Sequence, residues 1–305
     1  MARVIFAKGV KGEIVRKIQR KLTELSFDTN GIDGDYGNGT RKAIVAFQTE
    51  KGLDQTGEVD TTTYEALMGA PIPAVSERAL QLTAAFEGTG FTRAVGNFDG
   101  AGITWGIIGF TLRHGELKKI IMTINDEEPA LVRAAFKTKT DELLAVLNSS
   151  LAKQLAFADS ISLGAGKVRL AEPWRSSFER FGEFDRVQAL QLERAEKDYI
   201  QPARLTADKF GLKTELGLSL AIDIHVQNGR IKDPAAEQIR AELAAHPISN
   251  ERELRVIIGN AVADKANPKF REDVRSRKLT IATGAGSVHG ATYILRNWGL
   301  DNLPL

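Results

Sequence analysis

The sequence predicts a mainly helical α+β protein, in which a small three-helix domain precedes a larger domain with a small sheet of β hairpins. Three observations support this class. Apolar residues recur at helical spacing along most of the 305-residue chain. Two prolines, Pro71 and Pro73, interrupt the pattern among small residues. One stretch, residues 92–110, is rich in glycine and in residues that favour strands.

Composition excludes several classes of protein. A hydrophobic share of 43% and a charged share of 26% exclude a disordered or fibrous chain. The 41 Lys and Arg against 39 Asp and Glu leave a net charge of +2, too balanced for a dedicated nucleic-acid binder. Because cysteine is absent, disulfides and thiolate catalysis are excluded. No apolar run approaches the roughly 18 residues of a membrane span, so we expect no membrane insertion. We also expect the protein to be a monomer.

The first predicted domain covers residues 1–70 and is joined by a linker, residues 71–75, to a second domain, residues 76–305. Helical spacing predicts two helices in the first domain, and Thr40 is expected to cap the second of them. Residues 60–67 are expected to form a third helix. The apolar residues on the predicted helix faces are Ile14, Ile18, Leu22, Leu25, Ile44 and Phe47.

In the second domain, residues 92–110 carry five glycines among β-forming residues, which predicts hairpins. The remainder is expected to be helical, because apolar residues keep a period near 3.6 there. The predicted helices cover residues 76–87, 114–124, 129–147, 174–199, 214–228, 233–245, 249–265 and 268–278.

The first domain resembles the peptidoglycan-binding domain 1 family, a three-helix module of cell-wall hydrolases. The residues that carry the resemblance are Ile18-Gln19-Arg20-Lys21-Leu22, Gly34-Asp35-Tyr36-Gly37, Thr40, Ala43, Ala46-Phe47-Gln48, Gly52-Leu53, Gly57 and Thr63. The resemblance implies that glycan or stem peptide binds near the two glycine-rich loops. Asp35, Tyr36 and Gln48 are then the candidate contacts.

A pair of carboxylates marks the start of the second domain. Glu87 ends the first predicted helix, Asp99 follows in a turn flanked by glycine, and Thr104 comes five residues later. Glycoside hydrolysis needs one carboxyl group to protonate the leaving oxygen and a second carboxylate to activate a water molecule. A hydroxyl group beside the second carboxylate would help to hold that water.

These residues resemble the Glu–Asp–Thr triad of phage lysozymes and, more closely, the chitosanases of glycoside hydrolase family 46. The matching segments are Glu87-Gly88, Asp99-Gly100-Ala101-Gly102-Ile103-Thr104 and the predicted strand Gly106-Ile107-Ile108-Gly109-Phe110. The resemblance implies a lysozyme-like fold, with Glu87 as general acid, Asp99 as general base and Thr104 positioning the water. By the same analogy, Asp223 and Arg277 support Glu87. Trp105 is a candidate for lining a sugar subsite.

The sequence therefore predicts a modular peptidoglycan hydrolase that resembles a phage endolysin. We expect it to cleave the β-1,4 bond between N-acetylmuramic acid and N-acetylglucosamine with inversion, without a cofactor or metal. We expect no signal peptide at the start of the chain, since the apolar stretch there covers only Val4 to Ala7. Release from the host cytoplasm to the wall through a holin is the expected route. The alternatives are a lytic transglycosylase, a chitosanase and a non-enzymatic wall-binding protein.

Overall fold

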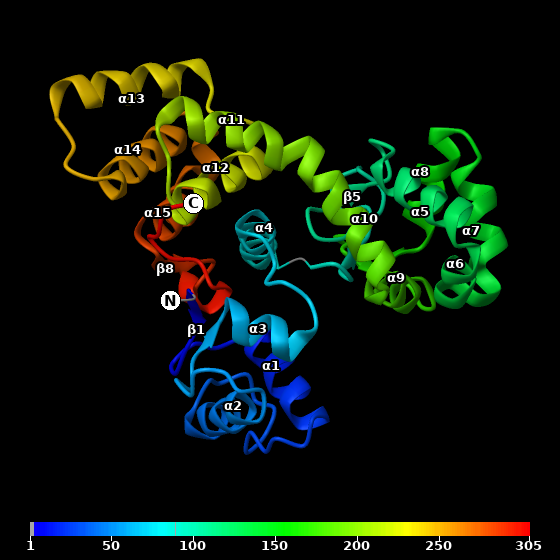
Figure 1. The fold of residues 1–305 in the computed structure, drawn as a ribbon. Coiled ribbons are helices and arrows are strands. Elements are labelled where there is room, and N and C mark those ends of the chain that lie inside the picture. Colours follow the sequence, from blue (N-terminus) through cyan, green and yellow to red (C-terminus); the bar gives the residue numbers. More distant parts are fainter. Residues whose placement is uncertain (1–2, 89) are drawn as a thin grey trace. The chain divides into compact units, whose positions relative to one another are not determined.

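The computed structural model describes residues 3–88 and 90–305, and most of its described elements are α-helices accompanied by small antiparallel sheets. The predicted mainly helical α+β class is confirmed. The chain divides into two compact units: Met1–Leu82 together with Ala203–Leu305 form the first, and Thr83–Pro202 form the second. Figure 1 shows the elements along the chain from blue to red. The boundary between a binding domain and a catalytic domain stays a prediction.

The N-terminal part of the first unit contains the three helices that the sequence predicted. Its elements are β1 (Val4–Phe6), α1 (Glu13–Glu24), α2 (Asn38–Glu50), β2 (Val59–Asp60) and α3 (Thr61–Met68). The strands β1 and β2 pair antiparallel, which the sequence analysis did not predict. Asp60 caps α3, because its side chain accepts a hydrogen bond from the Thr63 backbone N–H at 2.7 Å.

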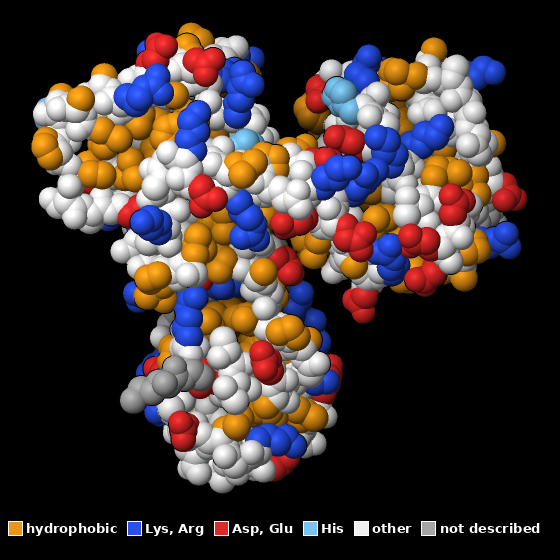
Figure 2. Space-filling view, turned by 45° about the horizontal axis from the view of Figure 1, so that its top comes forward, with side chains coloured by type: hydrophobic (Ala, Val, Ile, Leu, Met, Phe, Trp, Pro, Cys, Tyr) orange, Lys and Arg blue, Asp and Glu red, His pale blue; other side chains and the backbone are white. Residues whose placement is uncertain are grey.

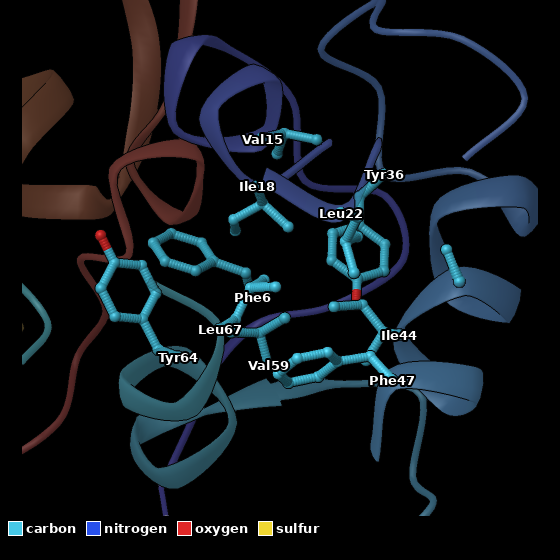
Figure 3. Packing of buried hydrophobic residues seen from close by; sticks show 11 residues of the cluster. Phe6, Val15, Ile18, Leu22, Tyr36, Ile44, Phe47, Val59, Tyr64 and Leu67 are labelled. Atoms are coloured by element: carbon cyan, nitrogen blue, oxygen red, sulfur yellow. The ribbon is translucent and has the colours of Figure 1, made fainter. Parts of the chain in front are cut away.

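These elements enclose a core of their own (Figure 3). Phe6 from β1, Ile18 and Leu22 from α1, and Phe47 from α2 are each at most 1% exposed, and the close-up shows how they gather in one cluster. Full burial of one such side chain contributes roughly 1.5–3 kcal/mol. The apolar spacing in the sequence therefore identified Ile18, Leu22 and Phe47, but it did not identify Phe6, and the predicted Leu25 is 41% exposed.

The same module contacts the C-terminal part of the first unit through a buried carboxylate. Glu215 is fully buried and forms ion pairs with Arg3 at 2.6 Å and with Arg78 at 3.2 Å. The Asp301 backbone N–H donates a further hydrogen bond to this carboxylate at 3.0 Å. Gly299 approaches the module so closely that a Cβ atom there would lie 2.8 Å from the Ile5 side chain. Residues 1–70 thus pack against residues 203–305.

The C-terminal part of the first unit is a helical bundle that ends in a hairpin. Its elements are α12 (Glu215–Asn228), α13 (Asp233–Ala245), α14 (Glu251–Asp264), the 3₁₀ turn η3 (Pro268–Phe270), α15 (Arg271–Thr283), β8 (Ala285–Val288), β9 (Ala291–Ile294) and η4 (Leu295–Trp298). Helix α12 is almost wholly buried, and it packs against α14 and α15. The hairpin β8–β9 was not predicted. Its turn places His289 and Gly290 at φ values of 50° and 79°, a conformation typical of tight hairpins.

The second unit joins a three-stranded sheet to a group of helices. Its elements are β3 (Ala94–Val95), β4 (Thr104–Trp105), β5 (Phe110–Thr111), α5 (Glu116–Glu127), α6 (Pro129–Phe136), η1 (Lys137–Lys139), α7 (Thr140–Leu147), α8 (Leu151–Ser160), β6 (Ser162–Leu163), β7 (Arg169–Leu170), α9 (Trp174–Glu183), α10 (Asp185–Ala195) and the π-helical η2 (Glu196–Ile200). Two helices, α4 (Val75–Phe86) and α11 (Gln201–Phe210), cross the unit boundaries. The predicted hairpin sheet is confirmed in the order β3-β4-β5.

Two of the predicted helices are divided in the structure. The helix expected over 129–147 is interrupted by η1, where Lys137 has a φ of 51°. The helix expected over 174–199 is interrupted at Phe184, whose backbone is extended. Helices α8 and α11 were not predicted at all. Periodicity does not reveal such breaks, because the apolar face continues on both sides of them.

The visible surfaces of both units carry basic and acidic side chains close to one another (Figure 2). This mixture agrees with the net charge of +2 for the whole chain. Within the described residues, no helix is long and apolar enough to cross a membrane. The sign of the charge at a cavity therefore depends on the residues that line that cavity.

Candidate active site

A cavity of about 390 Å³ opens in the second unit where α4 ends beside the three-stranded sheet. Its lining includes Glu87, which follows α4 directly, and Thr104, which lies in β4. Arg93, Phe98 and the loop residue Val168 complete much of the wall. Two of the three residues predicted to act on a glycosidic bond thus share one cavity.

Glu87 is positioned by the end of α4. Its backbone N–H donates to the Thr83 carbonyl at 3.3 Å, which continues the helical pattern by one residue. Gly88 then has a φ of 60°, a left-handed conformation that commonly terminates helices. Arg93 donates from Nη1 to the carbonyl oxygens of Glu87, at 3.3 Å, and of Gly88. A cation at this end is favourable, because the last carbonyls of a helix carry partial negative charge.

Thr104 is positioned by its place in the central strand. It pairs with Val95 of β3 and with Thr111 of β5. Its Oγ1 is buried and has no hydrogen-bond partner among the described residues. A buried hydroxyl group without a partner is unfavourable.

The glycine-rich segment after Thr104 forms a turn, and not the strand that its resemblance implied. Gly106 to Gly109 connect β4 to β5, and both glycines have left-handed φ values, 87° and 69°. The Gln191 side chain fixes this turn by accepting a hydrogen bond from Ile107 N–H at 2.9 Å. A Cβ atom on Gly106 would lie 2.4 Å from that Gln191 oxygen. Glycine is therefore required there for close approach and for conformation.

Asp99 lies on the exposed loop between β3 and β4. Its Oδ1 accepts a hydrogen bond from Ala101 N–H at 2.9 Å, and the neighbouring Asn97 Oδ1 accepts one from Gly102 N–H at 2.8 Å. These bonds order the loop. Asp99 is not among the residues that line the cavity of Glu87 and Thr104, and its role as a base stays a prediction.

Trp105 reaches the cavity wall, but its indole belongs to the core. The residue is fully buried, its ring lies 5.4 Å from the Phe181 ring, and its Nε1 donates to the Phe178 carbonyl at 3.0 Å. Its aromatic face is therefore not open to a sugar, contrary to the predicted subsite role. Phe98, which the sequence analysis did not single out, lines the same cavity and is 52% exposed.

Tyr199 is influenced by the charge of Glu87, although it is not among the residues that line the cavity. Burial raises the pKa of its hydroxyl group, and the negative charges of Glu116, Asp198 and Glu87 raise it further. The phenol therefore keeps its proton and remains a hydrogen-bond donor near neutral pH. It lies in the π-helical turn η2, 112 positions after Glu87 along the chain, and nothing in the local sequence connects the two.

The predicted contacts of the N-terminal module have mainly structural surroundings. Tyr36 is fully buried, and its hydroxyl donates to the Gly57 carbonyl at 3.2 Å. Gln48 is 1% exposed. Its Oε1 accepts from Gly57 N–H at 2.9 Å, while its Nε2 donates to the Glu58 carbonyl at 2.9 Å. These two side chains have no exposed surface for a polymer, whereas Asp35 is half-buried and pairs with Lys11.

Gln48→Ala is expected to destabilise the module. The substitution leaves the buried Gly57 N–H without its acceptor, and an unsatisfied buried group costs about 1–3 kcal/mol. Chemical denaturation of the full chain measures the change. Gln55→Ala is the matched control, because Gln55 is exposed. Unchanged stability combined with lost wall binding would instead show that Gln48 acts on the ligand.

Asp223 and Arg277 meet in the core of the first unit. Arg277 Nε donates to Asp223 Oδ1 at 2.7 Å, and Lys278 Nζ donates to the other carboxylate oxygen. Lys278 was not predicted, although it is fully buried and also donates to Gln227 Oε1 at 2.6 Å. Burial by itself raises the pKa of Asp223, but the cations of Lys278 and Arg277 outweigh it and hold the pKa below its ordinary value. Support of Glu87 by this cluster stays a prediction.

No group of histidine, aspartate and glutamate side chains suited to a metal ion occurs among the residues that the structure describes. The cavity of the second unit instead presents a carboxyl group, a hydroxyl group and an exposed aromatic ring. Fold and cavity together define a mainly helical α+β protein in which Glu87 and Thr104 line one cavity beside a small sheet.

Residues 11–67 match the family described as "Putative peptidoglycan binding domain". Two curated proteins are similar over short parts of the chain. A carboxy-terminal processing protease of Bacillus subtilis is 40% identical over 58 residues, and a probable N-acetylmuramoyl-L-alanine amidase of Bacillus licheniformis is 33% identical over 76 residues. These matches cover 19% and 24% of this chain, and 12% and 22% of the two relatives.

Solved chitosanases are similar to a larger part of the chain. A family 46 chitosanase of Gynuella sunshinyii, in complex with chitotetraose, is 19% identical over 73% of this chain and 98% of its own, with a TM-score of 0.44. A native chitosanase of Bacillus subtilis is 18% identical over 72% of this chain and 97% of its own, with a TM-score of 0.47.

Proposed function

We propose that this protein is a glycoside hydrolase of lysozyme-like fold that cleaves the glycan strand of bacterial peptidoglycan. The observation that carries the proposal is the cavity that Glu87 and Thr104 share, in a chain whose residues 11–67 match a peptidoglycan-binding family. The proposed bond is the β-1,4 link between N-acetylmuramic acid and N-acetylglucosamine. Residues 1–70 would bind the wall, residues 71–75 would form a linker, and residues 76–305 would cleave the glycan.

In the proposed reaction, Glu87 donates its proton to the glycosidic oxygen as the bond from that oxygen to the anomeric carbon breaks. A water molecule attacks the anomeric carbon from the opposite face, and Asp99 accepts the proton that this water loses. Thr104 Oγ1 positions the water, because it is a buried hydroxyl group without a partner among the described residues. The products are two shorter glycans; Asp99 then releases its proton to solvent, and Glu87 regains one from solvent.

Phe98 is proposed to pack against a sugar ring. It is 52% exposed and lines the cavity, and an aromatic face is a suitable surface for the apolar side of a pyranose. This assignment replaces the role predicted for Trp105. Arg93, also on the cavity wall, keeps the helix end beside Glu87 in place.

The experiment that tests the function is digestion of purified peptidoglycan followed by mass spectrometry of the released sugars. Fragments with reducing N-acetylmuramic acid support the proposal. Fragments with 1,6-anhydro ends would indicate a lytic transglycosylase, and cleavage of chitosan with no effect on peptidoglycan would indicate a chitosanase. Binding without any cleavage would indicate a wall-binding protein. As a phage endolysin, released through a holin, the protein would also lyse host cells from within.

The stereochemistry of the first product is expected to be inverted. If Asp99 and Thr104 hold a water molecule, the two carboxyl groups must stand about 6.5–9.5 Å apart to leave room for it. The α-anomer should then appear first from the β-linked glycan in proton NMR spectra recorded before mutarotation. Asp99→Asn should remove most of the activity, Thr104→Ala should remove less, and Asp126→Asn serves as an exposed control. Early accumulation of the β-anomer would remove Asp99 from the role of base.

A further inference from the structure

A second cavity, of about 340 Å³, lies within the first unit, where the end of α12 meets α13, α14 and α15. Its floor is apolar, because the lining residues Ala235, Val262 and Val274 are buried hydrophobics. At its edge Phe270 is 51% exposed. The mechanism proposed for Glu87 uses none of these residues.

Positive charge dominates the rim of this cavity. Arg230, Lys232 and Lys265 line it, and the described part of the chain provides none of their side chains with an ion pair or hydrogen bond. The one carboxylate in the lining belongs to Asp273, which already accepts from Gln227 Nε2 at 3.0 Å and pairs with His289. Three cations therefore face the cavity without a protein carboxylate of their own.

One residue of the lining, Asn228, also has a hydrogen-bond acceptor that lacks a donor. Asn228 Oδ1 is buried and has no hydrogen-bond partner among the described residues. A buried carbonyl oxygen of this kind is costly unless an N–H or O–H group reaches it. A ligand that suits the cavity thus combines negative charge, a hydrogen-bond donor and a small apolar part.

We propose that this cavity binds the carboxylate-bearing stem peptide of peptidoglycan. The peptide carboxylates would face Arg230, Lys232 and Lys265, a peptide N–H would donate to Asn228 Oδ1, and an alanine methyl group would lie on the apolar floor. A wall phosphate polymer shares the negative charge but has no amide N–H along its backbone. The identification of the negatively charged ligand as a stem peptide rests on the proposed function, whereas the cavity and its positive charge do not depend on that function.

The site would also distinguish between two glycans. Peptidoglycan carries acidic peptides, while chitosan is a polymer of cationic glucosamine. Three unpaired cations attract the first and repel the second, and the interaction weakens as salt rises. The first unit would then select substrates that carry peptides.

The test measures binding of a fluorescent stem tetrapeptide with free carboxylates to the full-length chain by anisotropy at low salt. The double variant Lys232→Gln/Lys265→Gln is compared with Lys213→Gln, a control whose exposed side chain lies outside the cavity. Each exposed charge contributes modestly, so we expect the dissociation constant to rise about 5–20-fold in the double variant. The control should match the wild type. Asn228→Ala separately tests the proposed hydrogen-bond acceptor, Asn228 Oδ1, and should weaken binding of the peptide as well.

Three results would overturn the proposal. Equal affinity in the double variant and the control would place the peptide elsewhere, for example on the N-terminal module. Equal affinity for a peptide with amidated carboxylates would show that charge plays no part. Binding of a glycerol phosphate oligomer, without binding of the peptide, would assign the cavity to a phosphate polymer. Because binding is measured without cleavage, failure of the proposed hydrolase activity leaves this result unaffected.

Discussion

Glu87→Gln is expected to reduce the rate of glycan cleavage by about 10²–10⁴-fold, the usual contribution of a general acid. The amide keeps the shape of the side chain but donates no acidic proton to the leaving oxygen. The measurement is the initial rate of release of soluble fragments from purified peptidoglycan. Binding to intact walls should remain unchanged, since residues 11–67 match the wall-binding family and lie apart from Glu87 in the sequence.

A matched control separates the loss of the Glu87 general acid from the effect of removing any surface carboxylate. Glu183→Gln makes the same chemical change at an exposed position at the end of α9 and should retain wild-type activity. The melting temperature of Glu87→Gln should stay the same or rise, because a negative charge is unfavourable at the C-terminal end of a helix. If both activity and melting temperature fall strongly, Glu87 is a structural residue and another group supplies the proton.

Asp223→Asn is expected to lower the free energy of unfolding by about 3–5 kcal/mol at neutral pH, since loss of one partner leaves buried charges uncompensated. Arg277 and Lys278 are 2% and 0% exposed, and both donate to this carboxylate. Denaturant titration of the full chain provides the measurement. Asp208→Asn, at an exposed position in α11, is the control and should change little.

The pH dependence of this difference follows from the lowered pKa of Asp223. The unfolded chain takes up a proton on this group near its ordinary pKa of about 3.9, before the folded chain does. The contribution of Asp223 is therefore fully present above about pH 4 and is lost as the pH falls through the lower folded pKa. The stability gap between the wild type and Asp223→Asn should narrow in that acidic range. A gap that stays constant to the most acidic condition in which the protein folds would contradict the assigned ion pairs.

Local patterns in the sequence were sufficient for most helices and for the hairpin sheet. The spacing of Ile18, Leu22 and Phe47 identified a core that the structure shows as fully buried. The order Glu87, Asp99 and Thr104 is also local, because a helix end, the following hairpin loop and the start of the next strand contain all three. Breaks such as Phe184 were missed, since a change in a single backbone angle leaves the apolar period intact.

The sequence by itself determined the helical class, the three-helix N-terminal module and the candidates for catalysis, since each depends on residues within a few turns of one another. Only the tertiary structure decided which side chains are open to a ligand. It buried Trp105, Tyr36 and Gln48 and left Phe98 exposed at the cavity. It also brought Lys278 to Asp223 and grouped Arg230, Lys232 and Lys265 around a second cavity. Burial and charge at a site depend on contacts between segments far apart in the chain, and no local pattern records those contacts.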